Sequence, residues 1–320
     1  MAKKHNMPDT KAAQRVVLIT QAYNEEENIR AFVHEVKINL SDYSLMIIII
    51  DDGSSDNTWK EIERLSREDK RIKGIRFSMN FGHQAALKAG VEGASNIDAD
   101  AYVMLDVDLQ HPIEMVPRMV EMLNDEVHIV QGTRNDEGRK ISFIKKFTLA
   151  LFYKVFTLRS GIRIKSGTSD FRALDRFALN FIINNIDKDA FLRGMLPWSG
   201  LQTEELCYFP KERANGVSKF TMRKMCNLAM SGIVGYSTRP LYVSLVLGSL
   251  SLSLSLVYII YVIIILVIGK ETAIGWASIV SCILGLGGTQ LLLLGIIGIY
   301  LGKMFNEMKP RPTCVISQTV

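Results

Sequence analysis

The sequence has few cysteines, the residues that stabilise small domains through disulfide bonds or zinc. It contains four cysteines, and no two lie close together in the chain. Neither a disulfide framework nor a structural zinc site is therefore expected. The first ten residues are polar and lack an apolar stretch, so no cleaved signal peptide is expected. Internal repeats, low-complexity tracts and obvious linkers are also missing.

Charged residues are missing from two long stretches near the carboxyl end. None occurs in Pro240–Gly269 or in Thr272–Gly302. Each stretch is longer than the ~20 residues that cross a bilayer as a helix. We therefore predict a C-terminal transmembrane hairpin with helices at about 241–268 and 275–301. Two buried core helices are the alternative.

Basic residues flank this predicted hairpin, whereas the loop inside it holds only Lys270 and Glu271. Because basic residues favour the cytoplasmic side, we expect residues 1–239 and the tail 303–320 in the cytoplasm and the hairpin in the inner (plasma) membrane. A nucleic-acid surface is the other explanation of the net charge of +5. Cations beside a hairpin can equally meet anionic lipid, so no nucleic-acid partner is expected. The flanking basic residues are Lys219, Arg223, Lys224, Arg239, Lys303, Lys309 and Arg311.

Residues 1–239 alternate between short apolar runs and stretches with helical spacing. This alternation predicts a doubly wound α/β domain with a mostly parallel sheet. Two further segments, near 142–158 and 219–234, are predicted to be helices at the membrane interface, with an ordinary packing helix as the alternative for the first. The predicted strands are Val16–Thr20, Leu45–Ile50, Ile72–Phe77, Ala101–Leu105 and Val127–Gln131, and the predicted helices are Glu25–Lys37, one from Asn57, His83–Gly93 and Glu114–Leu123.

Polar clusters follow three of the predicted strands at the point where each strand ends. They are Tyr23-Asn24-Glu25, Asp51-Asp52 and Asp106-Val107-Asp108-Leu109-Gln110. Ligands of open α/β sheets bind outside the carboxyl ends of the strands. The three clusters are therefore expected to converge on one crevice.

Asp106 and Asp108 suggest a metal site within this crevice. Two carboxylates held close together repel each other unless a cation lies between them. Oxygen ligands of this kind suit Mg²⁺ or Mn²⁺. Such an ion would bridge the diphosphate of a nucleotide-sugar and stabilise the charge on the departing diphosphate.

The motifs Tyr23-Asn24-Glu25, Asp51-Asp52-Gly53-Ser54-Ser55-Asp56-Asn57-Thr58 and Asp106-Val107-Asp108-Leu109-Gln110-His111-Pro112 resemble those of family 2 glycosyltransferases with the GT-A fold. The segments 166–172 (Ser-Gly-Thr-Ser-Asp-Phe-Arg) and 212–220 (Glu-Arg-Ala-Asn-Gly-Val-Ser-Lys-Phe) resemble the branch that contains dolichol-phosphate mannosyltransferases and bactoprenol glucosyltransferases. The resemblance covers nearly the whole chain. One departure is Gln21, where the family usually has proline.

The resemblance implies roles on the donor side of the site. Residues near the ends of the first and second strands would line the nucleotide, and the Asp-x-Asp segment after the fourth would hold the metal and the diphosphate. Arg134, near the end of the fifth strand, is a separate candidate for the diphosphate. Arg134 has the alternative of a surface ion pair. The nucleotide-sugar residues are Tyr23, Glu25, Asp52, Asp106 and Arg134, and the metal ligands are Asp106, Asp108 and Gln110, with Asp108 also counted as catalytic.

The resemblance also implies an acceptor side. Asp170 matches the aspartate usually called the catalytic base, with capping of a helix that begins near Leu174 as the alternative. Because a phosphate monoester is largely dianionic near neutral pH, Asp170 is expected mainly to orient the acceptor or to remove its last proton. Arg213, Ser218 and Lys219 match the segment thought to hold phosphate groups, with a solvated basic loop as the alternative.

The expected activity is therefore inverting transfer of one sugar, glucose from UDP-glucose, to polyprenyl (undecaprenyl) phosphate. N-acetylglucosamine, mannose and 4-amino-arabinose are alternative sugars, and the family suggests a homo-oligomer. Two spans and the absence of a Gln-x-x-Arg-Trp box disfavour a processive polysaccharide synthase. Retention of all three acidic clusters disfavours a non-catalytic scaffold.

Overall fold

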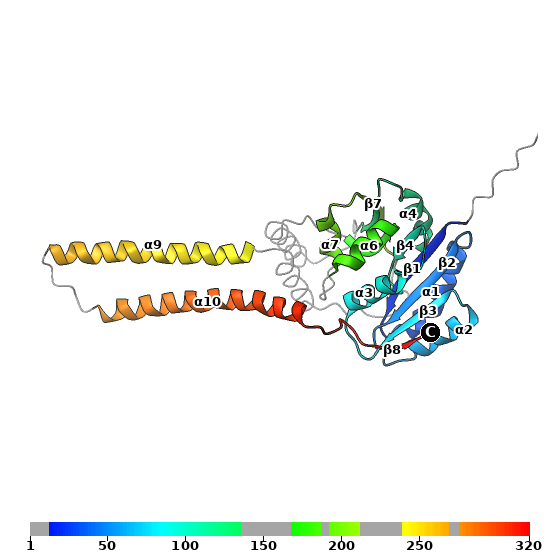
Figure 1. The fold of residues 1–320 in the computed structure, drawn as a ribbon, viewed down its shortest axis with the longest axis horizontal. Coiled ribbons are helices and arrows are strands. Elements are labelled where there is room, and N and C mark those ends of the chain that lie inside the picture. The colour runs from blue at the N-terminus through cyan, green and yellow to red at the C-terminus, as the bar shows by residue number, and fades with distance from the viewer. Residues whose placement is uncertain (1–12, 136–167, 187–191, 212–238, 269–274) are drawn as a thin grey trace, which may run out of the picture. The chain divides into compact units, whose positions relative to one another are not determined.

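The computed structural model describes residues 13–135, 168–186, 192–211, 239–268 and 275–320. The chain divides into two compact units, each treated by itself below. One contains the β-sheet with its covering helices, together with residues 311–320, and the other contains two long helices (Figure 1).

The described part of the first unit is built on an eight-stranded sheet with the order β7-β5-β6-β4-β1-β2-β3-β8. Strands β4, β1, β2 and β3 run parallel, as do β5 and β7, whereas β6 and β8 are antiparallel to their neighbours. The predicted mostly parallel sheet is confirmed. The strands are β1 (Arg15–Ala22), β2 (Ser44–Asp51), β3 (Ile72–Phe77), β4 (Ala101–Met104), β5 (Ile129–Arg134), β6 (Thr168–Leu174), β7 (Thr203–Tyr208) and β8 (Ile316–Thr319).

Helices cover both faces of this sheet. Side chains of α1 and α2 form one core cluster with alternate residues of β1 and β2, including Leu18 and Ile47. On the opposite face α3 packs so closely that a Cβ on Gly90 would lie 2.4 Å from a methyl carbon of Ile19. Alternation of side chains along the strands explains the two apolar faces. The helices are α1 (Glu26–Asn39), α2 (Thr58–Glu68), α3 (His83–Ala94), the 3-10 turn η1 (Ile113–Met115), α4 (Val116–Met122), α6 (Arg176–Asn185) and α7 (Leu192–Ser199).

The segment around Asp170 is a strand, whereas the alternative prediction made Asp170 the cap of a helix. Residues 168–174 form strand β6, and the next helix, α6, begins only at Arg176. The side chain that caps α6 is Asp175, whose Oδ1 accepts a hydrogen bond of 2.7 Å from the backbone N–H of Ala178. Asp170 therefore lies inside a strand, and the helix-capping alternative is wrong.

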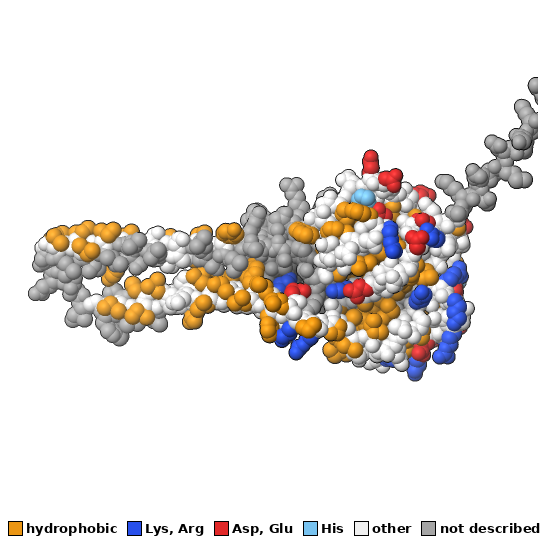
Figure 2. Space-filling view, in the orientation of Figure 1, with side chains coloured by type: hydrophobic (Ala, Val, Ile, Leu, Met, Phe, Trp, Pro, Cys, Tyr) orange, Lys and Arg blue, Asp and Glu red, His pale blue; other side chains and the backbone are white. Residues whose placement is uncertain are grey.

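The second unit contains α9 (Arg239–Val267) and α10 (Trp276–Met308), which contact each other. They cover the predicted spans at 241–268 and 275–301. Within the described residues, Gly285–Met308 is long and apolar enough to cross a membrane, with a mean hydropathy of 1.6. Hydrophobic side chains line both helices (Figure 2). The two-span hairpin stays a prediction, and the interfacial segments 142–158 and 219–234 lie outside the described residues.

Strand β8 was not predicted, because the sequence analysis expected only a tail at 303–320. The backbone groups of Gly74 and Val320 exchange two hydrogen bonds of 2.9 Å, and β8 pairs with β3 at the sheet edge. The chain therefore returns to the sheet after α10.

Gly53, in the loop after β2, offers a test of the packing at the carboxyl edge of the sheet. Its φ is 69°, and a Cβ at this position would lie 2.3 Å from the carbonyl carbon of Met79. Gly200 has a nearly identical φ of 70° but no atom within 4 Å of a Cβ. Gly53→Ala should lower the free energy of unfolding by about 3 kcal/mol or more, and Gly200→Ala by only about 1 kcal/mol. Thermal melting of the full-length variants in detergent measures both, and equal losses would contradict the close approach.

Candidate active site

The loops that follow β1 and β2 are locked together at the carboxyl edge of the sheet. The backbone N–H of Asn24 donates to Ser54 Oγ at 2.9 Å, and the backbone N–H of Ser55 donates to Asn24 Oδ1 at 2.9 Å. The backbone N–H of Glu25 donates to Thr58 Oγ1 at 2.9 Å. Asn24 adopts a positive φ of 53°, a conformation that asparagine tolerates better than most residues. Two of the three predicted polar clusters therefore lie together.

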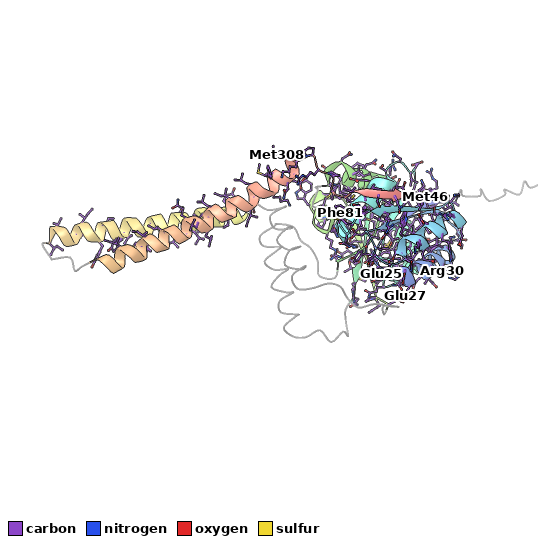
Figure 3. The ribbon with its side chains drawn as sticks, turned by 90° about the horizontal axis from the view of Figure 1, so that it is seen from below. Glu25, Glu27, Arg30, Met46, Phe81 and Met308 are labelled. Atoms are coloured by element: carbon purple, nitrogen blue, oxygen red, sulfur yellow. The ribbon has the colours of Figure 1, made fainter. Side chains whose placement is uncertain are left out.

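Tyr23 and Glu25 are half-buried in this pair of loops. Glu25 Oε2 accepts a hydrogen bond of 2.6 Å from the Asn28 side chain, one turn into α1, and Figure 3 labels Glu25 together with Glu27 and Arg30 of the same helix. Both residues are thus at the carboxyl edge of the sheet. Their contact with a nucleotide stays a prediction.

Asp52 is buried and accepts hydrogen bonds from the loop that precedes α3. Its carboxylate oxygens lie 2.7 Å from the backbone nitrogen of Phe81 and 2.9 Å from that of Gly82. Burial raises the pKa of Asp52, and these two N–H donors oppose the rise. The carboxylate therefore fixes the position of the β3–α3 loop beside the other two loops.

The Asp-x-Asp segment follows β4 and is shaped by His111. The backbone N–H of Asp106 donates to His111 Nδ1 at 3.1 Å, so the neutral ring carries its proton on Nε2, which lies 3.9 Å from Asp106 Oδ2. The buried His111 ring stacks on Phe171, with ring centroids 5.2 Å apart. Leu109 has a φ of 58°, and Asp108 Oδ1 accepts from the backbone N–H of Gln110 at 3.2 Å. The loop is therefore held in one conformation.

The carboxylates of Asp106 and Asp108 both act electrostatically on the hydroxyl of Tyr208, at the end of β7. Burial raises the pKa of this hydroxyl most, both carboxylates raise it further, and Arg134 lowers it. Arg134 is paired with Tyr208 in the register of β5 and β7. Arg134 ends β5 at the carboxyl end of the sheet, where the Asp106–Asp108 loop also follows its strand.

Asp106 is suited to hold a divalent metal ion. Its Oδ1 is buried and has no hydrogen-bond partner among the described residues, which is costly for a carboxylate oxygen unless a cation binds it. Within the same residues no group of three or more histidine, cysteine or acidic side chains forms a complete metal cage. One or two carboxylates, with substrate phosphates completing the coordination, are what Mg²⁺ uses in many enzymes. The residues present therefore fit such an ion.

Asp170 lies beside this loop, at the centre of a cluster of cationic side chains. Met104 of β4 pairs with Arg172 of β6, and the two strands are antiparallel. If this register continued past the end of β4, the residue opposite Asp106 would be Asp170. The side chain of Asp170 is 1% exposed. Oδ1 lies 2.7 Å from Arg172 Nη2 and 3.1 Å from Arg193 Nε, and Oδ2 lies 2.7 Å from Arg193 Nη2 and 2.8 Å from His83 Nε2.

These contacts keep Asp170 ionised. Burial by itself would raise its pKa, but Arg193, His83 and Arg172 together hold the pKa well below its ordinary value. In return the pKa of His83 is raised, because the attraction of Asp170 outweighs the effect of burial. We refer below to Asp170, Arg172, Arg193 and His83 as the Asp170 cluster.

A family model described as glycosyl transferase family 2 matches residues 17–182. The chain belongs to glycosyltransferase family 2. The SfII prophage-derived bactoprenol glucosyl transferase of Shigella flexneri is 35% identical to it over 311 residues, which cover 95% of this chain and 98% of that protein. The putative glycosyltransferase CsbB of Bacillus subtilis (strain 168) is 32% identical over 305 residues, covering 95% of this chain and 91% of that protein.

A solved structure, the mannosyltransferase PcManGT from Pyrobaculum calidifontis in complex with GDP-Man and Mn²⁺, is 16% identical with a TM-score of 0.47, and covers 71% of this chain and 64% of that one. The family membership and the full-length relatives establish that the chain is an enzyme, a hexosyltransferase with a GT-A-like sheet.

The sequence analysis did not predict the partners of Asp170 in this glycosyltransferase. Arg172 follows Asp170 by two residues, and in a strand this spacing puts both side chains on the same face. The ion pair would have been expected had β6 been recognised. Arg193, on α7, is joined to Asp170 only by the tertiary fold. The predicted phosphate ligands Arg213, Ser218 and Lys219 lie outside the described residues.

His83→Gln should reduce thermal stability in a pH-dependent way. The folded-state pKa of His83 lies above its ordinary value of 6.5, so its ion pair with Asp170 stabilises the fold below that pH and is lost as the pH rises through the raised value. The melting temperature of His83→Gln should therefore fall further below that of the wild type at about pH 6 than at about pH 9. His34→Gln, at an exposed position, controls for the loss of an imidazole. A gap of equal size at both pH values would contradict a charged His83.

Proposed function

We propose that this glycosyltransferase moves a single glucose from UDP-glucose to polyprenyl (undecaprenyl) phosphate, with inversion at the sugar C1. The observation that carries the proposal is the pairing of two sites at one sheet edge: the Asp106–Asp108 loop and the cationic Asp170 cluster. The first suits a nucleotide diphosphate with its metal, and the second suits a phosphate. The full-length similarity to a bactoprenol glucosyl transferase supports this acceptor and this sugar.

The donor side uses the three loops at the carboxyl ends of β1, β2 and β4. Tyr23, Glu25 and Asp52 would line the nucleotide, and Arg134 would approach the diphosphate. Mg²⁺ or Mn²⁺ would be held by Asp106 and Asp108 with Gln110, and when bound it supplies positive charge for the departing diphosphate. Asp52 and His111 keep the neighbouring loops in place through the hydrogen bonds described above.

The acceptor needs little help from a general base. A phosphate monoester has a second pKa of about 6, so near neutral pH it is already a good nucleophile. Orientation of this anion against C1 is then the main task of the protein. Arg213, Ser218 and Lys219 belong to the predicted acceptor side.

The membrane would confine both reactants to one layer. We propose that α9 and α10 anchor the enzyme in the inner (plasma) membrane, with the sheet domain and both termini in the cytoplasm and with a homo-oligomer as the working assembly. The apolar stretch Gly285–Met308 supports an anchor of this kind. The lipid-linked monosaccharide would then be used after transfer across the membrane by another protein.

A donor panel tests the proposed reaction. The full-length enzyme is incubated with undecaprenyl phosphate and one donor at a time: UDP-glucose, UDP-N-acetylglucosamine, GDP-mannose or UDP-4-amino-arabinose. The masses of the lipid products are measured by mass spectrometry. We expect one hexose per lipid from UDP-glucose, and a loss of about a hundredfold or more in kcat for Asp106→Asn. Long polymer in place of a single sugar would point to a processive synthase. Product from a different donor would revise the sugar, and no lipid product from any donor would refute the proposal.

A further inference from the structure

The Asp170 carboxylate has no capacity left for a proton. A carboxylate offers about four lone-pair positions. Oδ1 is approached by Arg172 and Arg193, and Oδ2 by Arg193 and His83, all at 3.1 Å or less. To accept a proton from a substrate, Asp170 would have to give up at least one of these charged partners inside a buried site.

Counted by itself, the Asp170 cluster has more positive than negative charge, and the Asp106 carboxylate next to it also acts on His83 and Arg172. One carboxylate faces two guanidiniums and a histidine whose pKa is raised by the same carboxylate. Arg172 is completely buried, and its Nε and Nη1 have no hydrogen-bond partner among the described residues. A surplus of buried positive charge is costly unless an anion approaches it. The cluster is therefore built to receive an anion.

Arg193 is the member of the cluster placed to meet that anion. Its side chain is 34% exposed, as is that of His83, whereas those of Asp170 and Arg172 are 1% and 0% exposed. Arg193 donates through Nε and Nη2 to the two carboxylate oxygens of Asp170, and this bidentate contact fixes the plane of the guanidinium. A planar, oriented guanidinium is well matched to phosphate oxygens.

The sheet order indicates which phosphate this is. Tyr23, Glu25 and Asp52, which are predicted to line the nucleotide, follow β1 and β2 on one side of β4, whereas Arg134, predicted to approach the diphosphate, ends β5 beyond β6. Asp170 lies on β6, on the other side of β4. A sugar bound at the Asp106–Asp108 loop would thus have the nucleotide on one side and the cluster on the other. The cluster side is where an acceptor phosphate would lie opposite a leaving diphosphate.

We propose that Arg193 binds the phosphate of the lipid acceptor and that Asp170 is a positioning residue that orients Arg193, with His83 and Arg172 completing the cluster. This rests on the proposed function. In the transfer, a phosphate oxygen of the dianion gives an electron pair to C1 and forms the new C1–O bond. The bond from C1 to the nucleoside diphosphate breaks at the same time, and the nucleoside diphosphate leaves with the pair of that broken bond. No proton has to be removed, so a saturated Asp170 does not impede the step.

Arg193→Gln, Arg193→Lys and Asp170→Asn in the full-length chain test this assignment. Two affinities are measured in detergent: that for a short-chain polyprenyl phosphate and that for UDP-glucose. Arg193→Gln should weaken polyprenyl phosphate binding by about tenfold or more and leave UDP-glucose affinity within about twofold. Arg193→Lys keeps the charge but loses the bidentate guanidinium, so its affinity for polyprenyl phosphate should lie between those of the wild type and Arg193→Gln. Melting temperatures identify any variant that fails to fold.

Arg71→Gln is the matched control. Arg71 donates to Asp69 through the same two nitrogens, with Nε 3.0 Å from Oδ1 and Nη2 2.8 Å from Oδ2. It precedes β3 and so lies at the amino end of that strand, away from the proposed site. It should change neither affinity.

The positioning role of Asp170 has its own readout. Asp170→Asn should raise the KM for the acceptor and keep the shape of the wild-type pH–rate profile, whereas loss of a general base would lower kcat and remove the acidic limb of that profile. Wild-type acceptor affinity in Arg193→Gln, or weakened UDP-glucose affinity in its place, would overturn the proposal. If the wild type binds polyprenyl phosphate but forms no lipid product, the proposed function fails while the assignment of Arg193 stands. If the wild type does not bind that lipid, both fail.

Discussion

The structure depends on how the carboxylates at the carboxyl ends of the strands are neutralised. Asp52 is satisfied by the backbone N–H groups of Phe81 and Gly82, and Asp170 by the cations of its cluster. Asp106 differs, because its buried Oδ1 has no hydrogen-bond partner among the described residues. Burial penalises an unpaired charge. The protein therefore completes the carboxylates of Asp52 and Asp170 itself, and Asp106 is the one that we propose holds the metal ion.

This division of labour links the fold to the chemistry. Parallel strands β1, β2 and β4 end at the same edge, so their loops meet without long connections. Strand β6 runs antiparallel beside β4 and pairs with it as far as Met104 and Arg172, which are two residues away from Asp106 and Asp170 respectively. Under the proposed function, the same end of the sheet would offer one position for a cation and one for an anion. Transfer of a sugar from a diphosphate to a phosphate needs both.

Much of the first half of the domain was predictable, because β1 to β5 are apolar runs that end in turn residues. The Asp106–Asp108 loop followed from this pattern. Strand β6 was missed because it buries Asp170 and Arg172, which a pattern of hydrophobicity assigns to the surface; each is tolerated only because the other neutralises it. β8 is exposed along its whole length, so no apolar face marked it. Arg193 reaches Asp170 from another element, and no sequence spacing encodes that contact.

The claim that Asp106 is the carboxylate left for a metal ion is tested most directly by Mn²⁺ binding. Titration of the full-length enzyme with Mn²⁺, followed by electron paramagnetic resonance in the presence of UDP, should show one bound ion per chain. The account predicts that Asp106→Asn weakens this binding by about tenfold or more and that Asp52→Asn leaves it nearly unchanged. Undiminished Mn²⁺ binding in Asp106→Asn would contradict it.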